Sequence, residues 1–259
     1  MHPADWRLIN ADNLEAIPAE LARARGNAVA RLLAQSDWLI RRKSDGRFIA
    51  VRRGDVVREL WRGAPGPELS EELASLAQSD ASGEALRPLS GLLERLHALG
   101  LNDDYGERSG LALVAEPNVL SYAGRDRYSR PLWLTASAAR AWRAMHSAAL
   151  HDGIKLQAIS GYRSHAYQLG IFRRKLARGL TVPEILAVNA APGYSEHHSG
   201  NALDIGTPGE PAAEESFELT PAFAWLASHA GEFGFSMSYP RDNPHGIVYE
   251  PWHWLHTPD

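Results

Sequence analysis

Residues 195–204 read Ser195-Glu196-His197-His198-Ser199-Gly200-Asn201-Ala202-Leu203-Asp204, and this stretch decides how the rest of the chain is interpreted. Working outward, Ser160-Gly161-Tyr162-Arg163-Ser164 precedes it at the end of an expected strand. On the other side, Glu250-Pro251-Trp252-His253 follows near the C-terminal end. Histidines, carboxylates and one arginine are therefore concentrated in three short segments, which makes these segments the candidate functional site.

Three of these residues are of the types that hold a catalytic zinc ion. Such a site usually has three protein ligands drawn from His, Asp and Glu, with a fourth position for water. His197, Asp204 and His253 would supply this set. The chain has no cysteine and eleven histidines, so thiolate ligands and disulfides are excluded. A zinc ion in such a set lowers the pKa of its bound water to roughly 7.

Glu250 is the candidate general base beside that water. Pro251 argues against a helix at this point, so the pair Glu250 and His253 does not form a helical HExxH arrangement. On a regular strand, positions 250 and 253 would face opposite sides. A bend or bulge is therefore required to bring both residues to one metal ion. The residues alone are compatible with a zinc hydrolase without deciding for it.

Taken together and in order, the three segments resemble the VanY-type D-alanyl-D-alanine carboxypeptidases, which are LAS metallopeptidases. That family pattern is SGYRS, then SxHxxGxAxD, then ExWH, and this chain has SGYRS at 160–164, SEHHSGNALD at 195–204 and EPWH at 250–253. The resemblance covers roughly residues 110–256. It implies an α+β fold in which an antiparallel central sheet carries a zinc site and has flanking helices, the LAS or hedgehog-like peptidase fold.

The resemblance also implies a role for each matched residue. His197, Asp204 and His253 would bind one Zn²⁺ per chain. Glu250 would be the base that activates the water and later protonates the leaving amine. Arg163 would stabilise the oxyanion of the tetrahedral intermediate, for which its fixed charge is suited. Substrate-binding positions would be Ser160, Gln168, Ser195 and Trp252.

The implied activity is removal of C-terminal D-alanine from peptidoglycan stem peptides or muropeptides, as a D,D- or an L,D-carboxypeptidase. The sequence does not distinguish these two specificities. One alternative is a peptidoglycan endopeptidase of the same family, and another is a non-catalytic module that binds cell-wall peptides. The presence of all three candidate ligands and of the candidate base argues against the binding module. His198 is expected to point away from the metal on an extended segment.

Composition narrows the range of partners. The 259 residues are 44% hydrophobic and 22% charged, with a net charge of −4, which does not suggest nucleic-acid binding. Arg173, Arg174 and Lys175 are interpreted as a solvated helix face. No run of about 18 apolar residues predicts a membrane span. The first thirteen residues lack a secretory pattern, so we expect a cytoplasmic protein, or a periplasmic one if the chain was trimmed.

Two domains are expected, with a boundary in the polar stretch 100–110: an accessory α+β domain over 1–105, of unknown role, and a catalytic domain over 106–259. Apolar spacing predicts a helix over 14–33, a hairpin formed by 38–40 and 48–51, and a third strand over 56–61. Further on it predicts helices over 71–76, 88–99, 135–150, 166–178, 183–188 and 221–233, and strands over 155–160, 201–205, 246–249 and 252–255.

Overall fold

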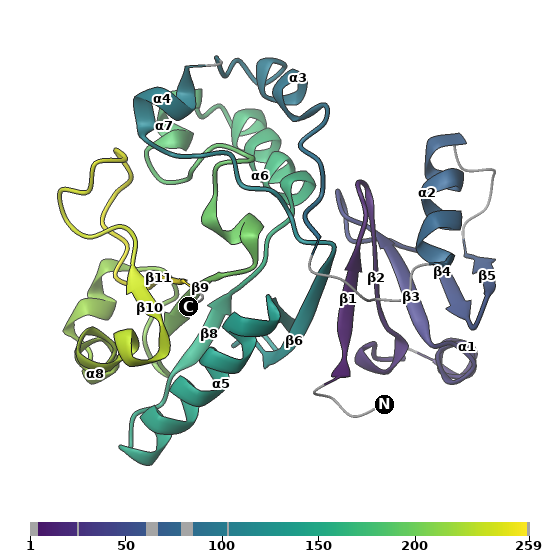
Figure 1. Cartoon of the computed structure of the whole chain (residues 1–259), viewed down its shortest axis with the longest axis horizontal. Helices are drawn as coiled ribbons and strands as arrows, with labels where there is room; N and C mark the ends of the chain where they lie inside the picture. Colours follow the sequence, from purple (N-terminus) through teal and green to yellow (C-terminus); the bar gives the residue numbers. More distant parts are fainter. Residues whose placement is uncertain (1–4, 25, 61–66, 79–84, 103, 258–259) are drawn as a thin grey trace. The chain divides into compact units, whose positions relative to one another are not determined.

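The computed structural model describes residues 5–24, 26–60, 67–78, 85–102 and 104–257. The chain forms two compact units (Figure 1). The first comprises Met1–Arg87 and Pro117–Tyr122, and the second comprises Pro88–Glu116 and Ala123–Asp259. Antiparallel sheets with accompanying helices make up the described residues, which confirms the predicted α+β class.

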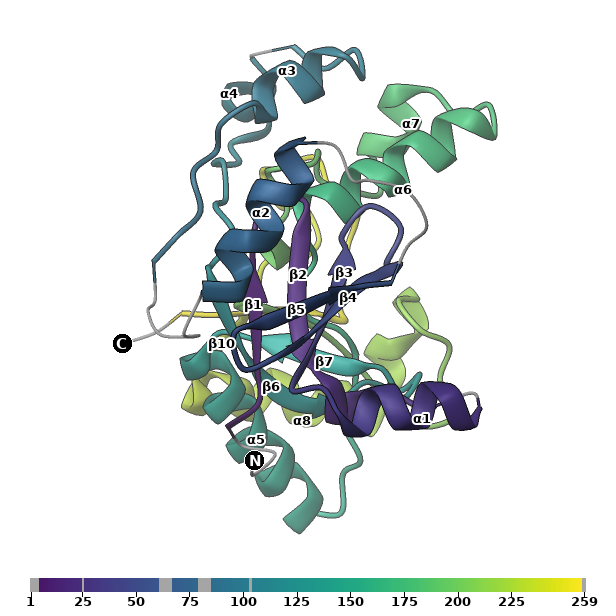
Figure 2. The same ribbon diagram turned by 90° about the vertical axis from the view of Figure 1, so that its right-hand side faces the viewer.

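The described residues of the first unit form an antiparallel sheet and two α-helices. Its strands are β1 (Arg7–Asn10), β2 (Leu14–Pro18), β3 (Trp38–Arg42), β4 (Phe48–Arg53), β5 (Val56–Glu59) and the first part of β6 (Val119–Arg125), and its helices are η2 (Ala19–Leu21), α1 (Asn27–Ala34) and α2 (Pro67–Gln78). The strand order is β5-β4-β3-β2-β1-β6. Leu73 and Leu76 of α2 are buried against Ile40 and Ile49 of the sheet, and Figure 2 shows α2 lying over the strands.

The helix predicted over residues 14–33 is wrong in its first part. Leu14–Pro18 is a strand between β1 and β3, and all five of its residues are buried. A strand that is buried on both faces lacks the alternation that reveals a half-exposed strand, so its apolar residues fitted helical spacing. Apart from the three-residue 3-10 helix η2, the described helical structure of this span begins at Asn27, after Gly26.

The other predictions in the first unit agree with the structure within its described residues. The hairpin is formed by β3 and β4, whose turn contains Gly46 with φ 69°, a conformation that favours glycine. The third strand is β5, although Trp61, the last residue of the predicted span, lies outside the described residues. The helix expected at 71–76 is α2, which is longer at both ends.

The second unit contains a four-stranded antiparallel sheet of order β10-β11-β9-β8. The strands of this sheet are β8 (Gln157–Ser160), β9 (Ala202–Gly206), β10 (Phe235–Met237) and β11 (His253–His256). The unit also contains β7 (Pro131–Leu134), which pairs with β6 and is not part of this sheet. Its helices are α3 (Leu92–His97), α4 (Tyr105–Ser109), α5 (Ala136–His151), α6 (His165–Ala177), α7 (Val182–Leu186), η3 (Glu196–Ser199), η4 (Glu215–Leu219), α8 (Pro221–His229) and η5 (Ala230–Phe233). None of the helices in the described residues could cross a bilayer, which takes about 20 apolar residues.

One face of this sheet packs on α5 and α8. Leu203, Ile205 and Trp254 of the sheet are buried in one cluster with Met145 of α5 and Leu226 of α8. Successive side chains of a strand point to opposite faces. Residues that alternate with these apolar side chains on β9 and β11 therefore point to the other face of the sheet, and they include the candidate ligands.

The predicted elements of the second unit are present with shifted ends, apart from one. Residues 246–249 form a loop and not a strand, because their main-chain groups are bonded outside the sheet. The Val248 amide donates to the Ala187 carbonyl, and the Ile247 carbonyl accepts from the Asn243 side chain at 2.7 Å. Strands β6, β7 and β10 and helix α4 were not predicted from the sequence.

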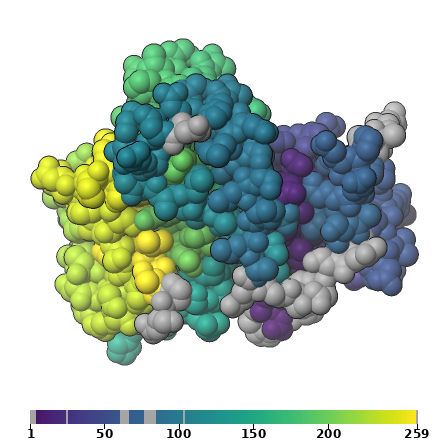
Figure 3. Space-filling view, turned by 45° about the horizontal axis from the view of Figure 1, so that its top comes forward, coloured from purple at the N-terminus to yellow at the C-terminus, as the bar shows by residue number. Residues whose placement is uncertain are grey.

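Residues 88–101 pack with the second unit. Leu92 and Leu96 of α3 are buried in one cluster with Phe172 of α6 and Ile185 of α7. Figure 3 shows atoms of this part of the chain, in teal, beside C-terminal residues in yellow. The contacts therefore divide the chain at 87/88, whereas the polar stretch at 100–110 suggested 105/106. An accessory role for the N-terminal region stays a prediction.

Two adjacent leucines of α3 test this packing. Leu92 is 1% exposed and Leu93 is 45% exposed. We expect Leu92→Ala to lower the free energy of unfolding by about 2–5 kcal/mol, because it leaves a cavity in the cluster. The matched control Leu93→Ala should stay within about 0.5 kcal/mol of the wild type. Urea unfolding of the full chain measures both, and equal small effects would show that α3 does not pack on this unit.

Candidate metal centre and its cavity

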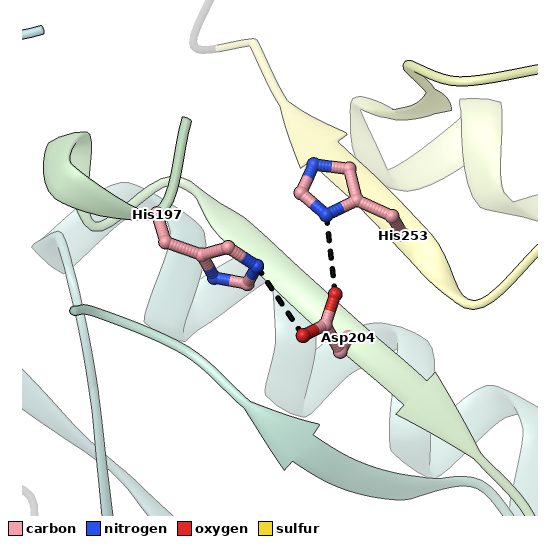
Figure 4. A group of neighbouring side chains, drawn as sticks. All are labelled: His197, Asp204 and His253. Carbon is pink, nitrogen blue, oxygen red and sulfur yellow. Dashed lines mark hydrogen bonds and ion pairs between the residues drawn. The ribbon is translucent and has the colours of Figure 1, made fainter. Parts of the chain in front are cut away.

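Strand pairing brings two candidate ligands directly opposite each other. In the register of β9 and β11, His253 is the partner of Asp204. Paired residues on antiparallel strands have Cβ atoms about 4.5–5.5 Å apart, so their side chains meet on one face. The third candidate, His197, comes from η3, which lies just before β9 (Figure 4).

The three side chains converge in the interior. Asp204 lies between the imidazoles, with Oδ2 3.3 Å from His197 Nε2 and Oδ1 3.1 Å from His253 Nδ1. One ligand atom from each residue can be chosen so that all lie within 4.8 Å of one another. Burial alone would raise the pKa of Asp204, but the two imidazoles outweigh burial and lower it. The group can therefore offer two ring nitrogens and a carboxylate to a metal ion.

Hydrogen bonds on the far side of each ring fix which nitrogen faces the centre. His197 Nδ1 lies 2.8 Å from the Gly161 carbonyl oxygen, which can only accept, so Nδ1 carries the proton. His253 Nε2 lies 2.8 Å from Glu196 Oε2 and donates to that carboxylate. The nitrogens that a metal ion would take as ligands are then Nε2 of His197 and Nδ1 of His253, which face Asp204 and would lose any proton shared with it when the ion binds. This is the tautomer assignment that metal ligation requires.

Glu196 is a functional candidate that the sequence analysis missed. Burial would raise the pKa of its carboxyl group, but the bond to His253 lowers it, so it remains an ionised acceptor. Ligand histidines usually donate their second N–H to a carboxylate, a carbonyl or water. A glutamate adjoining His197 was therefore a usable signal, although nothing in the sequence linked it to His253, 57 positions away.

Glu250 reaches the same centre through a tight turn. The His253 amide donates to the Glu250 carbonyl at 3.0 Å, and Pro251 occupies the second position of this turn, where proline is favoured. This supplies the bend that the spacing of the two residues required. Glu250 Oε2 lies 3.9 Å from His253 Nδ1. Burial raises the pKa of Glu250 to about 7, although His253 opposes the shift.

Arg163 faces the centre from the segment after β8. Its Nη1 donates to Gln168 Oε1 at 3.1 Å, and its Nη2 lies 3.9 Å from Asp204 Oδ2. Its main-chain amide donates to the His197 carbonyl at 3.1 Å. The segment that carries Arg163 and the segment that carries His197 are thus joined directly by their main chains.

His198 strengthens the same junction and does not face the metal ligands. It is fully buried, its Nδ1 donates to the Arg163 carbonyl at 2.5 Å, and its Nε2 accepts the Gly193 amide at 3.0 Å. Burial, together with the neighbouring His165, lowers its pKa well below the usual value. His198 is therefore a neutral buried crosslink between two loops.

A cavity of about 320 Å³ opens onto the three candidate ligands. Gln168, Ser195 and Trp252, which were predicted to bind substrate, line it together with Arg163 and Glu250. Ser160 is not among its lining residues; it lies on β8 opposite Asp204.

The three consecutive basic residues of α6, Arg173 to Lys175, differ in whether they face this cavity. Arg173 and Arg174 are exposed, as expected of a solvated helix face. Lys175 is half-buried and lines the cavity, so the interpretation as a solvated face is wrong for this residue. Three consecutive basic residues in a sequence do not indicate which of their side chains faces a cavity.

Comparison with known proteins identifies relatives of the second unit. The family model described as VanY, D-alanyl-D-alanine carboxypeptidase, matches residues 131–259. The Bacillus subtilis protein YodJ is 36% identical over 130 residues, which cover 47% of this chain and 45% of YodJ. An Enterococcus faecium D-alanyl-D-alanine carboxypeptidase is 32% identical over 126 residues, 47% of this chain and 37% of the relative. The matched region thus spans less than half of either relative.

A shorter relative is matched over most of its length. The bifunctional D-Ala-D-Ala dipeptidase and carboxypeptidase VanXYC of Enterococcus gallinarum is 30% identical over 136 residues, which cover 49% of this chain and 68% of that protein. Among solved structures, the LdcB LD-carboxypeptidase aligns with a TM-score of 0.48 at 29% identity, over 51% of this chain and 64% of that one.

Glu196 offers a test of how the centre is held. We expect Glu196→Gln to weaken the binding of a divalent metal by about 10- to 100-fold, because the charged acceptor that orients His253 is lost. The control Glu232→Gln removes the same charge from an exposed position and should bind metal like the wild type. Competition with a chelating dye measures the dissociation constants. An unchanged affinity in Glu196→Gln would show that the carboxylate does not support the ligand.

Proposed function

The chain belongs to the VanY family of D-alanyl-D-alanine carboxypeptidases, and we propose that its own reaction is the removal of C-terminal D-alanine from peptidoglycan peptides. The observation that carries this proposal is the cavity in which His197, Asp204 and His253 meet Glu250 and Arg163. These five side chains could supply three metal ligands, a general base and a cation for the developing oxyanion. The substrates would be stem peptides or muropeptides.

We propose zinc as the metal, with His197, Asp204 and His253 as its ligands. Two imidazoles and one carboxylate form a donor set that catalytic zinc sites use. One ligand atom from each of the three residues can be chosen so that all lie within 4.8 Å of one another, so the same side chains could hold one ion. Bound zinc would polarise the scissile carbonyl and lower the pKa of a coordinated water to roughly 7.

Glu250 is proposed as the general base and then the general acid. A group with a pKa near the operating pH transfers protons in both directions most effectively. Burial raises the pKa of Glu250 to about 7, which suits this double role. The residue would take a proton from the attacking water and pass it to the nitrogen of the leaving D-alanine.

Arg163 is proposed to stabilise the negative charge that develops on the carbonyl oxygen. Its guanidinium is a planar cation with several donors, and the Gln168 side chain holds it in place. Preorganised donors of this kind stabilise a transition state without being reorganised during the reaction. Ser195 and Trp252 line the same cavity and are proposed to contact the substrate.

Product analysis tests the proposal and separates its alternatives. The zinc-loaded full chain is incubated with a pentapeptide ending in D-alanyl-D-alanine, with the corresponding tetrapeptide, and with a cross-linked peptide. Mass spectrometry should detect free D-alanine. Release from the pentapeptide identifies a D,D-carboxypeptidase, and release from the tetrapeptide identifies an L,D-carboxypeptidase. Cleavage only within the cross-linked peptide would replace the proposal by an endopeptidase, and binding without cleavage would replace it by a binding module.

Replacement of Glu250 separates chemistry from metal binding. Glu250→Gln should keep its zinc, because Glu250 is not one of the three ligands. We expect its kcat to fall by roughly 10²–10⁴-fold, the usual contribution of a general base. The metal content by atomic absorption and kcat with the cleaved peptide are measured on the same sample. Activity within about tenfold of the wild type would rule out Glu250 as the base.

A further inference from the structure

Lys175 is the cation of the cavity that the proposed chemistry leaves unused. It lies seven residues after Gln168 on α6, which is two helical turns, so both residues lie on the same side of this helix. Both also line the cavity. The Cα–Cβ bonds of a helix tilt toward its N-terminus, so the Lys175 side chain is directed back toward Gln168. Gln168 in turn contacts Arg163.

The ammonium group of Lys175 has no anionic partner in the described part of the chain. No hydrogen bond or ion pair joins its side chain to those residues, whereas Arg163 is held by Gln168 and lies 3.9 Å from Asp204 Oδ2. Burial lowers the pKa of Lys175, and the like charge of Arg163 lowers it further. A half-buried ammonium beside a second cation is unfavourable unless an anion binds there.

The position of this cation relative to Arg163 indicates which anion fits. Arg163 is proposed to act on the carbonyl oxygen of the scissile bond. In a peptide that loses its last residue, the terminal carboxylate lies one residue beyond that bond, and consecutive Cα atoms are about 3.8 Å apart. A second cation that lines the same cavity as Arg163 could therefore meet the terminal carboxylate while Arg163 meets the scissile carbonyl.

We propose that Lys175 binds the free C-terminal carboxylate of the substrate, and that it thereby makes the enzyme select the last residue of a peptide. This inference rests on the proposed function and adds a specificity determinant to it. Lys175 would form a charge-assisted hydrogen bond with the carboxylate, a type of bond that is stronger than a neutral one. A peptide whose chain continues beyond the D-alanine lacks this carboxylate and would be a poorer ligand.

The test is a cycle of two peptides and four proteins. The peptides are the one that the wild type cleaves, with a free C-terminal acid, and its C-terminal amide. The proteins are full-length and zinc-loaded, and they carry Glu250→Gln so that binding is measured by calorimetry without turnover. The first protein is the Glu250→Gln variant, which serves as the background. The other three carry Lys175→Met, Lys175→Arg or Arg173→Met in addition. Arg173→Met is the matched control, because it removes one positive charge from an exposed position on the same helix.

We expect Lys175→Met to weaken binding of the acid peptide by roughly 10- to 100-fold, the range of a hydrogen bond to a charged group. Binding of the amide should be equal in the background and in Lys175→Met. Lys175→Arg should recover most of the affinity for the acid, and Arg173→Met should bind both peptides like the background. Equal losses for acid and amide, or no loss for either, would overturn the proposal.

A second pair of peptides separates the terminal carboxylate from another carboxylate of cell-wall peptides. One peptide carries diaminopimelate as its third residue and the other carries lysine, so they differ by one side-chain carboxylate. The effect of Lys175→Met should be the same for both. An effect confined to the diaminopimelate peptide would overturn the assignment to the C-terminus. Failure of the wild type to release D-alanine from any peptide would contradict the proposed function instead, so the two failures are distinguishable.

Discussion

The pairing of Asp204 with His253 across two antiparallel strands is the contact on which the rest of the centre depends. The register of β9 and β11 sets these residues opposite each other, and the alternation along each strand sends Leu203 and Trp254 to the other face. One register thus builds the packed core beneath the sheet and the polar centre above it. A shift by one residue would exchange the two faces and lose both.

The convergence of the candidate site residues could be predicted from the sequence better than the surroundings that hold them. The residues His197, Asp204, His253 and Glu250 stand in short segments whose order matches a known family, and the structure brings them together. The neighbouring residues that contact the site residues or the cavity could not be predicted in the same way. Glu196 meets His253 only because η3 and β11 are close in space, and Lys175 faces the cavity only because α6 presents that side. Such contacts are set by tertiary packing, and a single sequence does not show which distant residues pack together.

The same limit explains the outcomes for the fold. Helices α5 and α6 have exposed faces, so their apolar spacing is visible in the sequence and they were predicted nearly to their ends. Strand β2 is buried at every position and shows no alternation, so it was taken for a helix. Leu92 and Leu96 belong to the second unit through contacts with Phe172 and Ile185, which lie far along the chain. A boundary drawn from local polarity could not take these contacts into account.

The hydrogen bonds on the outer nitrogens of the two histidines have a consequence for folding. His197 is held by a main-chain carbonyl and His253 by Glu196, while Asp204 is fixed by strand pairing. The ligand atoms are thus oriented by the protein's own contacts, and the core beneath them is formed by apolar packing. In zinc fingers, by contrast, metal binding supplies the free energy of folding. In this chain the metal would enter a scaffold that is already organised, so chelation would remove its chemistry and leave its architecture in place.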